Sequence, residues 1–598
     1  MSTFEAPNRE GLFRQVNQGD TLGELWSTFN IDLSTSYGKL KTSKCLSPTL
    51  SEAKMDNDDI QAMGVFDGYY YAFGTGGRRM YLSSVRNPRN SGAWVSNSIS
   101  PFDTGSETDA VVFDGKLLVS TGTDIASFDD ITGSPDVDYW TNVLSGDDLT
   151  VNVPHIMNVS RLREETLFVT DGNKVRYFQK PDEHSTIYLA THLTACCIAS
   201  DAYATWVGTY SGEGNAMVYE IYEDETATVF DPGSSAVANI PVARRSYPIN
   251  GSAVLSMDIV DGVPYIVTDK GHIQTLNGRS FVTVAEFPFA MDGVSLAGLT
   301  LGNIDEDNTV RAIHPKGMRA DNRSLFININ TDNQLITDLA GNPIDDDDIF
   351  ENVVVNPRSS SGIWEYNLDT GILNHRYAFT NADTQNGFHR HQSSGPLLIT
   401  KNQYTRILAA SRLQSGRTDI YAEDPNGTPF GYFITREINS ETIQDGWEKL
   451  AIKKDVLNNE TIDVKYRTNK KTKIPKYNEA NWTGAKTFVV EEVIDDTAEV
   501  GFLVEIVDGY GAGKLSHITE ISTSATTTSI TVEDEIGSNG ESGYIRIWNF
   551  KKFNMDDFEQ HQTGGLSEAT EWVQFMVVLN GMVEVRQMFN KGSAKTTL

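Results

Sequence analysis

One short pattern recurs along the first two thirds of the chain: an Asp-Gly pair lies between two short apolar segments. The clearest copies have their aspartate at Asp67, Asp114, Asp171 and Asp261. An Asp-Gly pair supplies the positive φ angles that a two-residue hairpin turn requires. Each copy therefore predicts a tight turn that joins two antiparallel strands.

The segments beside these turns are too apolar for the simple alternation of a half-buried strand, as in Leu117-Leu-Val and Leu167-Phe-Val. Such runs are typical of strands buried on both faces between stacked sheets. Val65 and Val112, which open the first two copies, are 47 residues apart, and looser copies begin near Thr205, Leu325 and Leu397. About seven units at this spacing predict a β-propeller. The alternative is an irregular all-β sandwich with coincidental turns.

Two other regions differ from the repeat. Residues 1–55 are polar and irregular and predict an N-terminal extended arm, followed by the propeller over 56–430. Residues 431–598 lack the hairpin repeat, and 461–467 and 528–532 alternate with period two, which indicates half-buried strands. We expect a C-terminal β-sandwich or barrel domain there. The best helix candidate, 51–62, is short.

The charge limits the choice of partners. The chain has 81 acidic and 49 basic residues among 598, for a net charge of −32. Such a chain repels phosphate, which argues against nucleic acid or an anionic membrane as a bound partner. No apolar run approaches 18 residues, so we expect no membrane span. The N-terminus has no apolar core like that of a signal peptide, and we expect synthesis in a cytosol.

The three cysteines are too few for a disulfide framework, and they show no zinc-binding pattern. They are Cys45, Cys196 and Cys197. Because neighbouring residues of a strand point to opposite faces, Cys196 and Cys197 are expected to face apart.

The segment Gly511-Ala-Gly-Lys-Leu-Ser has some features of a phosphate-binding loop. That motif requires a glycine where Asp508 stands and a serine or threonine where Leu515 stands. The residues that follow read as a strand, whereas the phosphate cradle needs a helix N-terminus. We therefore predict a glycine-rich hairpin turn.

Several polar clusters could hold a metal ion. His389 and His391 would share one strand face, with His375 nearby in the chain. Asn303, Asp305 and Asp307 have the spacing of a calcium loop but lack its glycine and closing glutamate. Residues 56–59 and 345–348 are acidic runs. Solvated loops are the preferred interpretation of all of these, so we assign no metal, cofactor or catalytic residue.

Enzyme signatures are absent. The chain has no Gly-x-Ser-x-Gly motif and no sialidase box of the form Ser-x-Asp-x-Gly-x-Thr-Trp, and a Ser/His/Asp triad finds no support beyond the presence of its residue types. We predict that the protein is not an enzyme. The one basic run, 465–476, could meet the acidic propeller of a neighbouring copy or simply form a solvated hairpin tip.

The order of these features resembles tailed-bacteriophage virion proteins that combine a β-propeller with a β-sandwich. The resemblance rests on Ile31-Asp-Leu-Ser-Thr-Ser-Tyr-Gly-Lys-Leu-Lys near the N-terminus and on three C-terminal segments: Trp447-Glu-Lys-Leu, Thr461-Ile-Asp-Val-Lys-Tyr-Arg and Gly511-Ala-Gly-Lys-Leu-Ser-His-Ile-Thr-Glu-Ile. The resemblance extends over most of the chain as a similarity of general sequence pattern, and no catalytic residue carries over.

The resemblance implies a structural subunit of the tail nozzle or tail tip, located in the virion, where a nozzle forms a six-fold ring below the portal and adaptor. The expected partners are further copies of the chain and virion proteins such as an adaptor or a tail fibre. Genomic DNA would only pass by, because an acidic wall does not hold it. The alternative is a receptor- or glycan-binding tail adhesin, which predicts a cluster of exposed aromatic residues in a propeller pocket.

Overall fold

The structure is a computed structural model in which almost every element is a β-strand. It describes residues 25–33, 40–44, 46–49, 59–74, 78–82, 94–98, 109–144, 146, 148–151, 153–160, 166–179, 183–211, 215–230, 237–287, 313–321, 323–329, 362–379, 391–400, 406–413, 418–424, 430–435, 438–439, 447–455, 460–468, 477–494, 498–509, 511, 513–553, 556–558, 561–564 and 572–592. Within these residues, the one helical segment is a π-helical turn, Tyr139–Val143. None of the described helices is long and apolar enough to cross a membrane.

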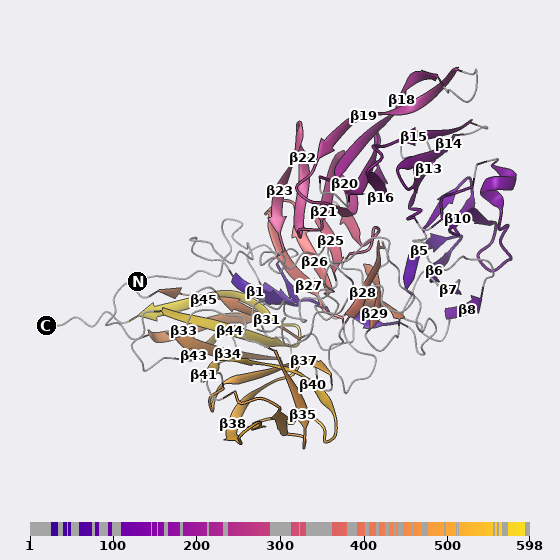
Figure 1. The fold of residues 1–598 in the computed structure, drawn as a ribbon. Helices are drawn as coiled ribbons and strands as arrows, with labels where there is room; N and C mark the ends of the chain where they lie inside the picture. Colours follow the sequence, from indigo (N-terminus) through magenta and orange to yellow (C-terminus); the bar gives the residue numbers. More distant parts are fainter. Residues whose placement is uncertain are drawn as a thin grey trace.

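Seven antiparallel sheets follow one another along the chain and form a ring (Figure 1). The first three blades consist of β5 (Ile60–Phe66), β6 (Tyr69–Gly74), β7 (Arg78–Leu82) and β8 (Trp94–Ser98); β9 (Ala110–Phe113), β10 (Lys116–Ser120) and β11 (Ile125–Phe128); and β12 (Met157–Val159), β13 (Thr166–Asp171), β14 (Lys174–Gln179) and β15 (Glu183–Tyr188).

Blades 4 to 6 each have four strands in chain order. They are β16 (Leu193–Ser200), β17 (Thr205–Ser211), β18 (Met217–Phe230) and β19 (Val237–Pro248); β20 (Val254–Val260), β21 (Val263–Thr268), β22 (His272–Asn277) and β23 (Ser280–Glu286); and β24 (Met318–Asp321), β25 (Ser324–Ile329), β26 (Gly362–Asn367) and β27 (Ile372–Tyr377).

The seventh blade closes the ring with a strand from the N-terminal segment. It consists of β28 (His391–Ile399), β29 (Ile407–Leu413), β30 (Thr418–Glu423) and β4 (Leu46–Pro48). The first strand of each blade contacts the first strand of the next, and β28 contacts β5. The predicted propeller of about seven blades is therefore confirmed, with seven.

The hydrophobic core of the propeller lies between the blades. Seven clusters of buried side chains fill the seven blade interfaces, for example Phe73 of blade 1 with Phe128 of blade 2. The last cluster joins Trp94 of blade 1 to Ile420 of blade 7. Because each blade packs on both faces, its strands are apolar without alternation.

The turns within the blades follow the predicted chemistry at three of the four Asp-Gly pairs. Asp67-Gly68 joins β5 to β6 with φ angles of 45° and 81°, and Asp114-Gly115 and Asp261-Gly262 are alike. The fourth pair differs, because Asp171 pairs with Lys174 as the last residue of β13 and the turn is Gly172-Asn173. The carboxylate of Asp171 is therefore buried rather than placed at the turn.

The C-terminal region contains both a sandwich and a barrel. One sandwich sheet has β1 (Leu25–Phe29), β31 (Phe430–Thr435), β32 (Ile438–Asn439), β34 (Thr461–Thr468), β41 (Lys551–Phe553) and β44 (Trp572–Asn580). The other has β2 (Ile31–Asp32), β3 (Leu40–Thr42), β33 (Trp447–Asp455), β42 (Asp556–Phe558), β43 (His561–Gly564) and β45 (Glu584–Gly592).

A closed six-stranded barrel is inserted into the chain between β34 and β41. Its strands are β35 (Tyr477–Trp482), β36 (Thr487–Val490), β37 (Leu503–Gly509), β38 (Leu515–Thr523), β39 (Thr528–Val532) and β40 (Ser542–Trp548). Apolar side chains such as Phe488 and Ile530 fill its interior. Figure 1 shows the barrel against the sandwich, away from the propeller blades.

The N-terminal segment, predicted as an extended arm over 1–55, supplies four strands to three sheets in its described part. The strands β1, β2 and β3 enter the sandwich, and β4 enters the propeller. The helix candidate 51–62 was wrong where the structure describes it, because 60–62 belong to β5; residues 51–58 lie outside the described part.

The cysteine prediction was also wrong. A β-bulge between Ala195 and Cys197 breaks the alternation of β16. As a result, the thiols of Cys196 and Cys197 both point at the carbonyl oxygen of Val254, at 3.0 and 3.7 Å. Cys45 lies outside the described residues.

Candidate functional site

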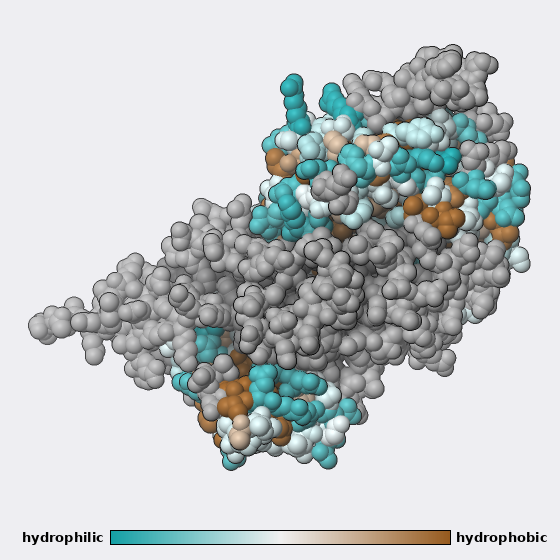
Figure 2. Space-filling model, viewed as in Figure 1, coloured by the Kyte–Doolittle hydropathy of each residue, from teal (hydrophilic) through white to brown (hydrophobic). Residues whose placement is uncertain are grey.

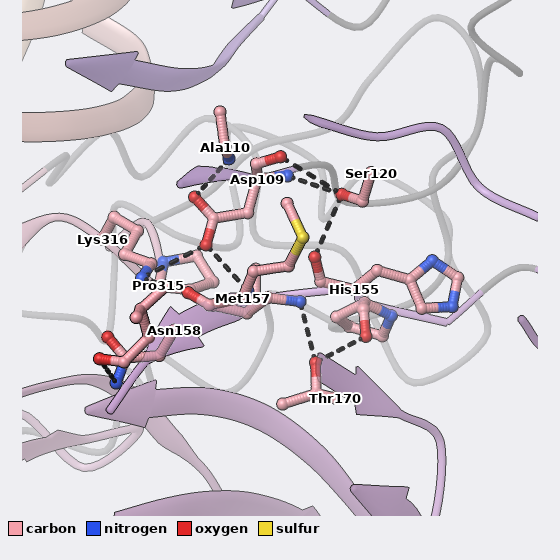
Figure 3. A network of polar contacts seen from close by, with 12 residues as sticks. Asp109, Ala110, Ser120, His155, Met157, Asn158, Thr170, Pro315 and Lys316 are labelled. Atoms are coloured by element: carbon pink, nitrogen blue, oxygen red, sulfur yellow. Dashed lines mark hydrogen bonds and ion pairs between the residues drawn. The ribbon is translucent and has the colours of Figure 1, made fainter. Parts of the chain in front are cut away.

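The axis of the propeller carries a buried polar network, and we take it as the candidate site (Figure 3). Side chains on one inner strand bond to the backbone of the next. The Asp109 carboxylate accepts a hydrogen bond from the Met157 N–H at 2.8 Å. Asp258 accepts one from the Ala320 N–H at 2.7 Å, and Arg319 donates to the Leu397 carbonyl at 3.2 Å. These bonds lock neighbouring blades together in register.

Lys316 crosses the axis. It lies two residues before β24, the inner strand of blade 6, and its ammonium group donates to the Met157 carbonyl of blade 3 at 2.9 Å. The same group lies 3.2 Å from Asp109 Oδ2, at the start of blade 2. Lys316 therefore braces blade 6 against two blades on the opposite side of the ring (Figure 3).

Burial governs the electrostatics of this brace. It lowers the pKa of Lys316, while the Asp109 carboxylate opposes the shift. Burial has the opposite effect on Tyr71, because it disfavours the charged phenolate: it raises the pKa of Tyr71, and the negative charge of Asp109 raises it further. A buried cation that keeps its charge needs such a partner and hydrogen bonds. Its contacts with Asp109 and the Met157 carbonyl hold the Lys316 amine in place, so that Lys316 links blades on opposite sides of the axis.

Ser120, His155 and Asp171 meet near this network but do not form a catalytic triad. The Ser120 hydroxyl donates to the carbonyl oxygen of His155 at 3.1 Å, not to its ring. The His155 ring lies 3.6 Å from Asp171, whose carboxylate also accepts from Arg176. A triad requires the serine hydroxyl to bond the imidazole. The geometry here instead connects blades 2 and 3.

A second buried network joins the propeller to the sandwich. Arg376 of β27 contacts Asp32 of β2 at 2.9 Å and Glu365 of β26 at 3.1 Å, with all three side chains at most 6% exposed. Its guanidinium also donates to the Ser43 hydroxyl at 2.6 Å. Burial by itself lowers the pKa of Arg376, but Tyr377, Asp32 and Glu365 raise it above its ordinary value.

Neutral contacts extend this junction. The Asn30 N–H donates to Nδ1 of His375 at 3.1 Å, and the Phe29 ring stacks on the same imidazole. The Asn374 side chain donates to the Ile31 carbonyl at 2.7 Å. His375, which the sequence suggested as a possible metal ligand, is therefore a buried contact of the N-terminal segment.

A third network fixes the barrel to the sandwich. Glu505 of β37 accepts two bonds from Arg546 of β40 and one from the Trp548 indole at 2.7 Å. Tyr432, on the sandwich strand β31, donates to the other carboxylate oxygen at 3.2 Å. The barrel therefore shares a buried charged anchor with the sandwich.

The other sequence candidates have varied positions. Gly511 and Gly513, with φ angles of 81° and 87°, lie in the hairpin between β37 and β38, as the hairpin interpretation predicts. Within the basic run, 465–468 belong to β34 and 469–476 lie outside the described residues. The following candidates also lie outside the described residues: His389, the side chain of His391, and the runs 303–307, 345–348 and 56–58. Among the described side chains, no group of three could hold a metal ion.

The sequence did not identify Lys316, Asp109, Arg376 or Asp32. Lys316 and Met157 are 159 residues apart, and Arg376 and Ser43 are 333 apart. In the sequence, a single charged residue beside an apolar strand gives the same pattern whether its side chain faces solvent or the propeller axis. The one available signal was the position of Asp109 three residues before Val112, which opens the second hairpin repeat.

No family model matches the chain, and no curated protein matches its sequence. Among solved structures, the computationally designed Ika8 protein matches with 9% identity and a TM-score of 0.31, covering 63% of this chain and 99% of that one. BBS1N in complex with ARL6DN matches with 8% identity and a TM-score of 0.35, covering 64% and 95%. BamB from Moraxella catarrhalis matches with 10% identity and a TM-score of 0.27, covering 50% and 81%.

Proposed function

We propose that this chain is a structural subunit of a bacteriophage tail, in the nozzle or tail-tip ring, and forms part of the conduit through which DNA is ejected. The support is threefold: the resemblance in sequence, the net charge of −32, and the way in which the propeller and the sandwich are joined. The proposed ring contains several copies of the chain and contacts other virion proteins such as an adaptor or a tail fibre.

The junction between propeller and sandwich is the observation that carries the proposal. Domains that share a chain are expected to move relative to one another unless their interface is extensive. Here the N-terminal segment pairs with strands of both sandwich sheets and of blade 7, and Arg376 adds a buried ion pair to Asp32. Such a junction suits a subunit that keeps one shape within an assembly.

The braced axis bears on where DNA would travel. Lys316 spans the centre of the ring of blades, and Asp109 and Met157 hold it there. In the proposal DNA therefore passes through a channel between copies of the chain, and not through the propeller. A strongly acidic wall would repel phosphate and keep DNA from adhering.

The adhesin alternative receives less support from the described residues. Among the described side chains, Tyr188 and Tyr203 are the most exposed large aromatic residues, at 71% and 72%. Tyr188 ends the outer strand β15, whereas Tyr203 lies in the turn between β16 and β17, so propeller topology places them at opposite faces. On the face seen in Figure 2, hydrophobic areas of the described surface are small and scattered.

The test is the oligomeric state and symmetry of the purified protein, by mass measurement and electron microscopy. The proposal predicts a closed ring, with six copies expected from the resemblance. A monomer that binds host glycans would favour the adhesin, and a monomer that cleaves them would indicate an enzyme. Either result would contradict the proposed function.

A further inference from the structure

The N-terminal segment crosses from one sandwich sheet to the other at Asn30, which lies between β1 and β2. The φ angle of Asn30 is 54°, in the left-handed region that asparagine tolerates better than most residues. Its side chain donates to the Phe430 carbonyl at 2.7 Å and accepts from the Ala378 N–H at 3.2 Å. This bend therefore contacts both the sandwich strand β31 and the end of the outer strand of blade 6.

The imidazole of His375, on β27, holds the bend from the propeller side. Its Nδ1 accepts a hydrogen bond from the Asn30 backbone N–H at 3.1 Å, and the ring is fully buried. Phe29 stacks on the imidazole with ring centroids 5.0 Å apart, and Trp364 meets it edge-on at 5.5 Å. A Cβ atom on Gly362 would lie 2.9 Å from Nε2 and would crowd the ring. The ring is therefore confined to a close-fitting site.

The hydrogen bond from Asn30 sets the charge of the imidazole in the closed junction. A ring nitrogen that accepts from a backbone N–H carries no proton, so His375 is neutral there. Protonation at Nδ1 would set two N–H donors against each other. In a buried site, the loss of such a bond costs the desolvation of the groups left unpaired. Histidine is the residue type that ordinarily gains its proton in mildly acidic solution.

The other titratable groups near this bend belong to different residue types. Arg376 lies 2.9 Å from Asp32 and 3.1 Å from Glu365. Tyr377 donates to Glu423 at 2.8 Å. Among the described residues, the charged and titratable groups on β27 and the strands around it are Arg376 and Tyr377, Glu365 and Tyr366 on β26, Asp32 on β2, Lys41 on β3, Glu286 on β23, Glu423 on β30 and Tyr432 on β31. Carboxyl groups ordinarily titrate near about pH 4, and tyrosine, lysine and arginine at about pH 10 or above, so the range from pH 7 to 5 isolates the histidine.

We propose that His375 makes the junction between propeller and sandwich sensitive to pH, because protonation of its imidazole releases the bend at Asn30 from the propeller. The open junction frees the ring to take a proton that the closed junction excludes. The closed junction therefore keeps its full stability above about pH 6.5 and loses stability as the pH falls below that value. Opening becomes about tenfold more frequent for each further pH unit. The inference goes beyond the proposed ring function and does not depend on it.

Hydrogen exchange of the full chain at pH 7.5 and pH 5.5, with each rate divided by the intrinsic rate at that pH, measures the opening. Peptides that cover 29–33 should open about tenfold more often at pH 5.5. His375→Asn, in which Oδ1 can replace Nδ1 as the acceptor but takes no proton, should abolish this difference. The matched control is His517→Asn in the barrel, where the buried His517 ring bonds the Gly501 carbonyl; this variant should keep the tenfold difference.

The native chain tests the inference even if His375→Asn fails to fold, which circular dichroism would reveal. Equal opening of the native bend at the two pH values would overturn the inference. An equal rise in the peptide that covers 116–120 of blade 2 would also overturn it, because the effect would then be general acid destabilisation. With a folded His375→Asn variant, a tenfold difference that persists would assign the pH sensitivity to another group and would likewise contradict the role of His375.

Discussion

Replacing Arg376 with methionine tests the junction between propeller and sandwich. The guanidinium lies 2.9 Å from Asp32 and 3.1 Å from Glu365, and both carboxylates are 2% exposed. Methionine matches the stem of arginine but leaves these carboxylates without their cation. Breaking a buried ion pair by removing one partner costs about 3–5 kcal/mol.

The remaining contacts place the expected loss near the lower end of that range. Asp32 keeps Lys41 at 3.3 Å, and Glu365 keeps the Ser324 hydroxyl at 2.6 Å. We therefore expect a loss of about 3 kcal/mol in the free energy that holds the junction closed, which makes opening about a hundredfold more frequent, at about 1.4 kcal/mol per factor of ten.

Hydrogen exchange measured by mass spectrometry resolves this opening, because it reports local stability. Peptides that cover 29–33 and 40–43 should exchange about a hundredfold faster in Arg376→Met. The control is Arg323→Met in the same blade, since Arg323 and Asp369 are 3.9 Å apart and 82% and 64% exposed. Exposed pairs contribute at most about 1 kcal/mol. Equal exchange in the two variants would refute the claim that the buried pair holds the junction.

Three further predictions concern the propeller. Lys316→Met leaves Asp109 buried without its cation and should lower the free energy of unfolding, measured in urea, by about 3 kcal/mol. The control Lys270→Met, at an exposed lysine, should change it by less than about 0.5 kcal/mol. Equal losses in the two variants would contradict the role of Lys316 as a brace. Burial would raise the pKa of Asp171, but the His155 ring 3.6 Å away and hydrogen bonds from Arg176 and Thr150 hold it well below its usual range. This carboxylate therefore stabilises the fold above about pH 4 and loses that contribution as the pH falls further, so Asp171→Asn should flatten the acid side of a melting-temperature profile, and a parallel profile would be evidence against the shift. Gly115→Ala places a Cβ at φ 74° and should cost about 1 kcal/mol in urea unfolding, whereas Gly484→Ala, with open space and no positive φ, should cost less; the reverse order would contradict the predicted turn type.

The fold was predictable where local chemistry repeats. Asp67-Gly68 and Asp114-Gly115 specify turns through their own backbone preferences, and the apolar segments beside them, such as 117–119, indicate strands buried on both faces. Seven units were enough to predict a propeller. The bulge at Cys196 and the shifted turn at Asp171 were not predictable, because each depends on pairing with a neighbouring strand.

The buried polar networks were beyond the reach of sequence patterns. Asp32 and Arg376 are distant in the chain and meet only because β2 packs against β27. Nothing local separates Arg376 from a solvated arginine on an outer strand. The role of the N-terminal segment was not predictable for the same reason. Its strands pair only with strands of the sandwich and of blade 7, which are distant in the chain, so the sequence alone indicated an extended arm.

Electron microscopy of the assembled protein tests the central claim most directly, because one reconstruction gives both the number of copies and the residues that line the channel between them. A subunit of a DNA conduit predicts a closed ring of copies with Asp and Glu predominating on the channel wall. A monomer, or a channel lined by Lys and Arg, would contradict it.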